Sequence, residues 1–258
     1  MKKDYIPALL PGDSEVDFVQ SYWTDVWERS GGPSLKFKSI QSSEEFKTIN
    51  KFFKSLPLNS KTLDAGCGLG NWTVELNSLG YNTVGLDLST STIVQLKSLF
   101  PNVVFDSGDL RNTSFDSSSF DAYISWGVFE HFEAGPRECL TEAFRLIKPN
   151  GLLCISVPFD NLRHSFLSHF VKKVSQKPLR FYQYRFTQQE LINELTISGF
   201  VPICIRPIHK RQGILRCLHH EFGLPYDWFA TKALSVILQP FIPSFLVSHM
   251  LIAVARKS

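Results

Sequence analysis

Short apolar segments alternate with amphipathic ones along the middle of the chain. Mostly apolar segments that are typical of buried strands occur at 61–65, 83–86, 103–105, 122–125, 152–157 and 201–205. Apolar residues recur at helical spacing over 71–79, 90–99, 136–147 and 188–198. Strands that alternate with helices pair in parallel through right-handed crossovers. The pattern therefore predicts an α/β fold with a Rossmann-like, doubly wound sheet.

The two ends of the chain depart from this alternation. Tyr22, Trp23 and Trp27 stand at helical spacing, and a second amphipathic helix is expected at 44–55. We therefore expect a helical N-terminal cap segment over 1–55, followed by the main domain over 56–258. Residues 233–255 carry no charge and are long enough to span a bilayer. Because Pro240 and Pro243 would break such a helix, we expect a short helix, a turn and a buried final strand there, with no membrane span.

Composition excludes several protein classes. Hydrophobic residues make up 43% of the 258 residues and charged residues 20%, which excludes collagen-like, coiled-coil and wholly disordered chains. Five cysteines include no Cys-x-x-Cys pair, so neither a disulfide scaffold nor a metal site is expected. The first residues lack the apolar stretch of a secretory signal. These features favour a reducing, cytoplasmic location.

Charge is distributed unevenly along the chain. Residues 1–158 have a net charge of −5, whereas residues 159–258 have a net charge of +8. This asymmetry indicates either two ligands of opposite charge or two ordinary solvated faces. Residues 159–186 combine aromatic side chains with six Lys or Arg residues. Because they follow a strand of the predicted sheet, we expect them to form a lid over the site, the alternative being a surface helix that completes the core.

The candidate site lies where the first strands of the sheet end. Gly66, Gly68 and Gly70 follow the first strand at alternate positions, an arrangement that lets a ligand lie against bare backbone. Asp64 lies in this strand, while Asp87 and Asp109 end the second and third. A carboxylate at the end of the second strand can accept both hydroxyls of a ribose. Three acids favour a cationic, adenosine-containing ligand, although Asp109 could instead form a turn.

Several motifs resemble those of class I S-adenosylmethionine-dependent methyltransferases. Leu63-Asp64-Ala65-Gly66-Cys67-Gly68-Leu69-Gly70 is similar to their first motif, Gly85-Leu86-Asp87-Leu88-Ser89 to the second-strand motif, and Gly108-Asp109-Leu110 to the adenine-side motif. Phe186-Thr187-Gln188-Gln189-Glu190-Leu191, followed by Ser198-Gly199-Phe200, resembles a C-terminal signature of their small-molecule branch, which includes quinone-biosynthesis methyltransferases. The resemblance covers about 60–207 and implies a seven-stranded, mostly parallel sheet with an antiparallel last strand.

The resemblance also implies S-adenosylmethionine as the cofactor and a set of residues that bind it. The glycine loop would border the methionine part, Asp87 the ribose, and Asp109 with Leu110 the adenine, while Trp126 would separate cofactor from acceptor. The residues that we expect to bind the cofactor are Asp64, Gly66, Cys67, Gly68, Gly70, Asp87, Leu88, Asp109, Leu110 and Trp126.

The residues that act on the acceptor are predicted from residue chemistry. His131 is the candidate general base because an imidazole titrates near neutrality, the alternative being a structural histidine. Aromatic side chains exclude water, and arginines bind anionic groups in a forked geometry. The residues that we expect to contact the acceptor are Tyr22, Trp23, Arg180, Tyr184 and Arg185.

Three classes of function remain open. The favoured one is a methyltransferase that acts on a small-molecule or lipid-like acceptor with an anionic group, with peripheral membrane contact left open. The others are a protein or RNA methyltransferase and a non-catalytic adenosyl-ligand binder. Ser125-Trp126-Gly127-Val128 stands where amino-methylating nucleic-acid enzymes carry Asn/Asp-Pro-Pro-Tyr/Phe, so DNA is not expected as a partner. The sequence predicts no oligomeric state.

Overall fold

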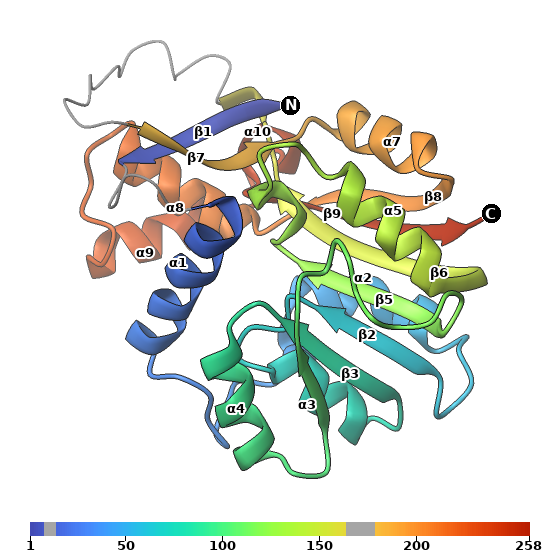
Figure 1. The fold of residues 1–258 in the computed structure, drawn as a ribbon. Coiled ribbons are helices and arrows are strands. Elements are labelled where there is room, and N and C mark those ends of the chain that lie inside the picture. The colour runs from blue at the N-terminus through green and yellow to red at the C-terminus, as the bar shows by residue number, and fades with distance from the viewer. Residues whose placement is uncertain (8–13, 164–178) are drawn as a thin grey trace.

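The computed structural model describes residues 1–7, 14–163 and 179–258. Within these residues a seven-stranded sheet runs through the molecule in the order β4-β3-β2-β5-β6-β9-β8 (Figure 1). Its strands are β2 (Lys61–Ala65), β3 (Asn82–Asp87), β4 (Val104–Ser107), β5 (Phe120–Trp126), β6 (Ile147–Pro158), β8 (Phe200–Ile208) and β9 (Met250–Lys257). The strands from β4 to β6 are parallel, whereas β9 is antiparallel to both β6 and β8. The predicted sheet, with its antiparallel last strand, is confirmed.

Helices cover both faces of this sheet, which is why its central strands are apolar throughout. On one face, α5 (Arg137–Leu146) and α7 (Gln188–Ile197) pack in a core that includes Tyr123 of β5. On the other face, α2 (Glu44–Phe53) and α3 (Asn71–Ser78) pack in a second core that includes the next residue, Ile124. Successive side chains of a strand point to opposite faces, so both faces of β5 are buried.

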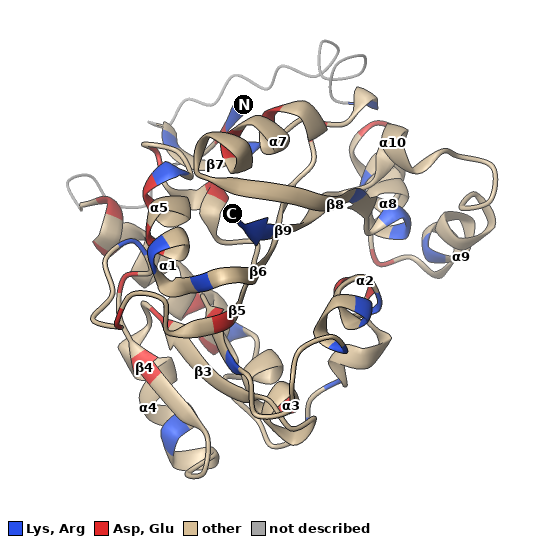
Figure 2. Cartoon of the chain, turned by 90° about the vertical axis from the view of Figure 1, so that its right-hand side faces the viewer, with Lys and Arg blue, Asp and Glu red and all other residues tan. Residues whose placement is uncertain are grey.

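The other described helices lie at the edges of this layered core. They are α1 (Glu15–Arg29), α4 (Thr90–Leu99), α8 (Lys210–His220), α9 (Phe229–Ile237) and α10 (Ser244–Val247), with the 3-10 turns η1 (Ile40–Ser42) and η2 (Phe129–His131). Figure 2 shows α8, α9 and α10 beyond the β8 edge of the sheet, with α9 farthest out. Residues 229–257 form the predicted sequence of a helix, a turn and a buried strand, preceded by α8, which the pattern did not predict. No described helix is both long enough and apolar enough to cross a membrane.

A two-stranded ribbon joins segments that are far apart in the sequence. β1 (Lys2–Pro7) pairs antiparallel with β7 (Leu179–Arg185), so that Lys2 lies opposite Arg185 and Pro7 opposite Leu179. Residues 2–7 are therefore a strand and not part of a helical segment, and the end of the basic stretch is also a strand. Residues 164–178, the middle of the predicted lid, lie outside the described residues.

Candidate active site

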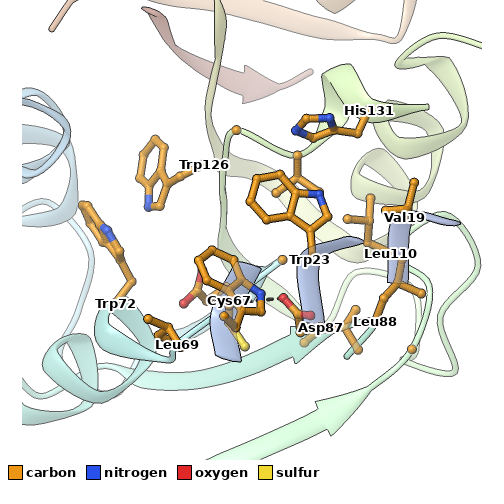
Figure 3. Close-up of a pocket in the computed structure, with 18 of the residues that line it drawn as sticks. Val19, Trp23, Cys67, Leu69, Trp72, Asp87, Leu88, Leu110, Trp126 and His131 are labelled. Atoms are coloured by element: carbon orange, nitrogen blue, oxygen red, sulfur yellow. Dashed lines mark hydrogen bonds between the residues drawn. The ribbon is translucent and has the colours of Figure 1, made fainter. Parts of the chain in front are cut away.

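A pocket of about 260 Å³ opens at the carboxyl ends of β2, β3 and β5. This is the edge of a doubly wound sheet at which ligands bind. The helix α1 contributes one wall of the pocket, and the segment that follows β5 contributes another (Figure 3). The residues that line it are Val19, Trp23, Trp27, Asp64, Gly66, Cys67, Gly68, Leu69, Asn71, Trp72, Leu86, Asp87, Leu88, Gly108, Leu110, Trp126, Gly127, Val128, His131 and Phe132.

The glycine loop forms the floor of the pocket and leaves no room for side chains. Gly66, Gly68 and Gly70 all have positive φ, between 49° and 80°. A Cβ on Gly66 would lie 2.5 Å from Val128, and a Cβ on Gly68 would lie 2.7 Å from Trp27. Both the backbone conformation and the close approach therefore require glycine. Gly66 and Gly68 line the pocket, whereas Gly70 does not, because its Cβ position faces Leu96 and Phe105 in the core.

Two buried carboxyl groups stand beside this loop. Asp87 accepts hydrogen bonds from the backbone N–H groups of Gly68 and Ser89, at 2.8 and 2.9 Å, one on each oxygen (Figure 3). Asp64 accepts a hydrogen bond of 2.7 Å from the hydroxyl of Thr73. Burial raises the pKa of both groups, and it raises that of Asp64 to about 7. An isolated buried carboxylate is unfavourable, so a cation bound in this pocket would stabilise both charges.

Asp109 has a different environment from the other two acids. Gly108 and Leu110 line the pocket, whereas the carboxylate of Asp109 is held by the guanidinium of Arg111 at 2.7 Å. Arg111 also donates to Glu15 of α1 at 2.8 Å. Asp109 therefore fixes α1 over the end of β4 through Arg111, and its contact with an adenine remains a prediction.

Four tryptophans give the pocket an apolar, aromatic wall. Trp23 stacks on Trp27, with ring centroids 5.2 Å apart, and both come from α1. Trp72 lies 4.9 Å from Trp126, on the other side of the pocket (Figure 3). The indole N–H groups of Trp27 and Trp126 are buried and have no hydrogen-bond partner among the described residues. Buried donors of this kind normally have a partner, so these two point to a ligand acceptor atom.

His131 closes the upper end of the pocket, between Trp23 and Tyr182. Its ring centroid is 5.1 Å from each of theirs. Its Nδ1 lies 2.8 Å from the carbonyl oxygen of Tyr182, which can only accept, so Nδ1 carries the proton of the neutral ring. A second backbone contact, with Gly127, also favours the protonated ring. Burial lowers the pKa of His131 to about 4, below the near-neutral value that motivated its choice as general base. It is therefore neutral at physiological pH and a weak base.

Glu130, the neighbour of His131, is also buried and uncharged. Burial raises its pKa to about 8. Glu130 Oε1 lies 3.9 Å from His131 Nε2, but between about pH 4 and pH 8 neither group is charged, so the two form no ion pair at neutral pH. No local pattern predicts a protonated carboxyl group here, because it arises from burial alone.

The residues predicted to bind the acceptor are only partly brought together. Trp23 lines the pocket, and Tyr22 contacts Tyr182 beside it, with centroids 5.5 Å apart. Tyr184 is buried and donates to the carbonyl of Glu133 at 2.8 Å. Arg185 is paired with Asp4 at 2.7 Å, and Arg180 donates to the carbonyl of Ser14 at 3.0 Å. Arg185 therefore holds β1, Arg180 the start of α1 and Tyr184 the segment after η2, and none of the three lines the pocket.

Comparison with known proteins relates the central residues of the chain to a family. Residues 63–155, which contain the glycine loop, both buried carboxyl groups and Trp126, match the family described as "Methyltransferase domain". These residues form a class I, S-adenosylmethionine-dependent methyltransferase domain. The resemblance drawn from the motifs is confirmed over this range. Two of the four pocket tryptophans were not predicted as site residues: Trp27, which stands one helical turn after Trp23, and Trp72.

Relatives of the methyltransferase domain include enzymes of quinone biosynthesis. A demethylmenaquinone methyltransferase from Paenarthrobacter aurescens is 34% identical over 119 residues, which are 46% of this chain and 46% of the relative. A phosphoethanolamine N-methyltransferase from Haemonchus contortus, solved with S-adenosyl-L-methionine, has a TM-score of 0.64 at 20% identity and covers 96% of this chain and 60% of its own.

A structural neighbour of similar length extends the likeness to the whole chain. The 1,6-didemethyltoxoflavin-N1-methyltransferase from Burkholderia thailandensis has a TM-score of 0.59 at 16% identity, and covers 100% of this chain and 96% of its own. At these identities the structural likeness shows the fold. The chain spans less than half the length of the demethylmenaquinone methyltransferase that it matches.

Proposed function

We propose that the whole chain transfers a methyl group from S-adenosylmethionine to a small-molecule acceptor that has an apolar portion and an anionic group. The observation that carries this proposal is the position of Asp87. Its carboxylate is buried at the end of β3, beside a glycine loop, and each oxygen accepts one backbone hydrogen bond. Each oxygen keeps a lone pair with which to accept a ribose hydroxyl.

The described residues fit this cofactor. Asp87 would accept the ribose hydroxyls, the bare backbone at Gly66 and Gly68 would border the methionine part, and Asp64 would face its cationic groups. Leu88 and Leu110 would enclose the adenine. Bound there, the cofactor supplies a methyl group that its sulfonium already activates, so the protein has chiefly to align the reactants and exclude water.

The aromatic wall performs the exclusion of water. Trp23 and Trp27 cover the glycine loop from α1, and Trp126 lies after β5 on the acceptor side. An aromatic pocket favours an acceptor with an apolar body. The imidazole of His131 lines the acceptor end of the pocket, where it would contact an acceptor hydroxyl or amine. The role of His131 as general base is part of the proposal.

The anionic, lipid-like character of the acceptor is supported by charge. Residues 159–258 carry the excess of positive charge, and the front half carries acids that suit a cationic cofactor. We also propose a reducing, cytoplasmic setting, since the five cysteines are all free thiols.

Calorimetry with the purified full chain tests the cofactor assignment. We expect S-adenosylmethionine and its demethylated product to bind, and Asp87→Ala to weaken both by about 1.5–3 kcal/mol, or roughly 10- to 150-fold, because a charge-assisted hydrogen bond is lost. Asp116→Ala is the matched control, since Asp116 is an exposed acid outside the pocket. Absence of binding at millimolar cofactor, or equal affinities for the two variants, would refute the assignment.

The acceptor is then found by mass spectrometry. Cell extract is incubated with the enzyme and isotopically labelled S-adenosylmethionine, and labelled products are identified. A labelled apolar, anionic metabolite is the expected result. Label in protein or RNA would make the chain a macromolecular methyltransferase, and binding without any labelled product would make it an adenosyl-ligand binder.

A further inference from the structure

The helix α9 is oriented with its two hydroxyl side chains inward. Thr231 and Ser235 are 1% and 0% exposed, whereas Phe229 and Ile237 are 83% and 61% exposed. Leu234 and Leu238 pack beside the buried core residues of α8 and α10, so α9 has apolar residues on both sides. The hydroxyl of Thr231 is buried without a hydrogen-bond partner among the described residues. A helix with apolar residues on opposite sides is stable where other apolar groups cover both of those sides.

The exposed aromatic residues of the molecule are concentrated around this helix. In the part of the chain that the structure describes, every Phe or Trp with an exposed side chain lies between 222 and 245: Phe222, Trp228, Phe229, Phe241 and Phe245. Val236 and Ile237 are exposed in the same stretch. Scattered single apolar residues are ordinary on a protein surface, but a concentration of this kind indicates a contact site.

Positive charge flanks this apolar surface. α8, which packs against α9, carries Lys210, Arg211 and Arg216, and the structure pairs none of the three with an acid among the described residues. Arg211 is exposed and reaches α9, where its Nε lies 3.4 Å from the hydroxyl of Ser235. Beyond Glu221 the chain has a single acid, Asp227, which is paired with Lys232 at 3.0 Å.

We propose that α8, α9 and α10, the docking face (residues 210–247), bind the surface of a bilayer that contains anionic lipid. Exposed Phe, Trp and Ile side chains would enter the boundary between headgroups and acyl chains, while Lys210 and Arg211 of α8 contact headgroup phosphates. α9 has nine residues and is about 14 Å long, so it lies in the interface and does not span it. A second copy of the chain is disfavoured as occupant, because a two-fold contact would bring the unpaired bases of both copies together.

The docking face is connected to the pocket along the chain. α10 ends at Val247, and Met250, three residues later, lies beside Gly127, which lines the pocket. Docking would therefore bring the acceptor side of the site near the lipid from which an apolar acceptor could be taken. The docking inference stands apart from the proposed methyl transfer, because it depends on the surface alone.

Sedimentation with large unilamellar vesicles tests the proposal on the full chain. One vesicle set contains 30% phosphatidylglycerol in phosphatidylcholine, and the other contains phosphatidylcholine alone. We expect the chain to sediment with the first set and bind the second more weakly. Phe229→Ser with Ile237→Ser should lower the partition coefficient about 10- to 100-fold, since two apolar side chains no longer enter the bilayer. Val94→Ser with Ile197→Ser, two similarly exposed positions on other helices, is the matched control and should bind as wild type.

Further variants and controls distinguish membrane binding from a loss of folding and from dimerisation. Lys210→Gln with Arg211→Gln should remove the preference for the anionic vesicles, a loss of up to about 30-fold. Circular dichroism and cofactor calorimetry on every variant show that fold and pocket are intact. Failure of the wild type to bind either vesicle set overturns the proposal, as does equal binding by the two serine pairs. The proposal is also overturned if the wild type binds no vesicles but forms a dimer, and if Phe229→Ser with Ile237→Ser dissociates that dimer.

Discussion

We expect Asp64 to couple cofactor binding to pH. Burial, together with the nearby carboxylate of Asp87, raises the pKa of Asp64 to about 7, against the opposing effect of the hydrogen bond from Thr73. A cation within about 4–6 Å lowers the pKa of a carboxyl group by about 1–3 units. Binding of the cationic cofactor is therefore expected to expel a proton from Asp64, and affinity should fall as the pH drops below 7.

The magnitude follows from the fraction of Asp64 that is ionised before binding. If the cofactor binds only to protein in which Asp64 is ionised, the apparent dissociation constant of the cofactor is proportional to one plus the ratio of protonated to ionised Asp64. For a pKa of about 7, this factor is about 2 at pH 7 and about 11 at pH 6. The cofactor should bind about fivefold more weakly at pH 6, or about 1 kcal/mol. Its own amino group, with a pKa near 8, stays protonated over this interval.

Calorimetry at pH 6 and pH 7 measures this linkage directly. Titrations at pH 7 in two buffers of different ionisation enthalpy should give about half a proton released per cofactor bound. Asp64→Asn is the control, because an amide cannot titrate, and its proton release and pH dependence should both vanish. Equal affinities at the two pH values, together with the same proton count in the wild type and in Asp64→Asn, would refute the reasoning.

Two further predictions concern the upper end of the pocket. Burial raises the folded-state pKa of Glu130 to about 8, so the free energy of unfolding of the wild type falls as pH rises from about 4.5 to 8. Glu130→Gln should therefore be more stable than the wild type at pH 7, by up to about 3 kcal/mol. Denaturant unfolding should show this gain disappear at pH 4, and a pH-independent difference would contradict it. If His131 is the general base, His131→Ala should lower turnover by roughly 10²–10⁴ with cofactor affinity almost unchanged. Turnover within a few-fold of wild type would assign His131 a structural role.

Much of the sheet could be predicted because its signals are local. A short apolar strand such as 61–65 is buried on both faces, and the helix that follows Thr187 has a capping box with Glu190, which the structure contains. The glycine loop and Asp87 could be located in the same way, since strand ends in a doubly wound sheet meet at one edge.

Contacts between distant segments explain what the sequence did not show. β1 is a polar segment that becomes a strand only by pairing with β7. α8 contains Gly213, which is ordinarily unfavourable in a helix, yet a Cβ there would lie 1.6 Å from the carbonyl oxygen of Val247. The carboxylate of Asp109 is paired with Arg111, which also donates a hydrogen bond to Glu15, 96 residues away in the sequence. Each of these depends on tertiary packing, which no local pattern encodes.

The ribbon of β1 and β7 also has a consequence for the order of folding. Its partners are separated by about 180 residues, so β1 cannot pair until most of the chain has been synthesised. Until then, α1, which carries Trp23 and Trp27, lacks the ribbon beside it, and the glycine loop is expected to stay open to chaperones and proteases. The main sheet is also completed late, because β9, which pairs with both β6 and β8, is synthesised after β7. Newly made chains should therefore acquire the ability to bind cofactor only after nearly the whole chain has been synthesised.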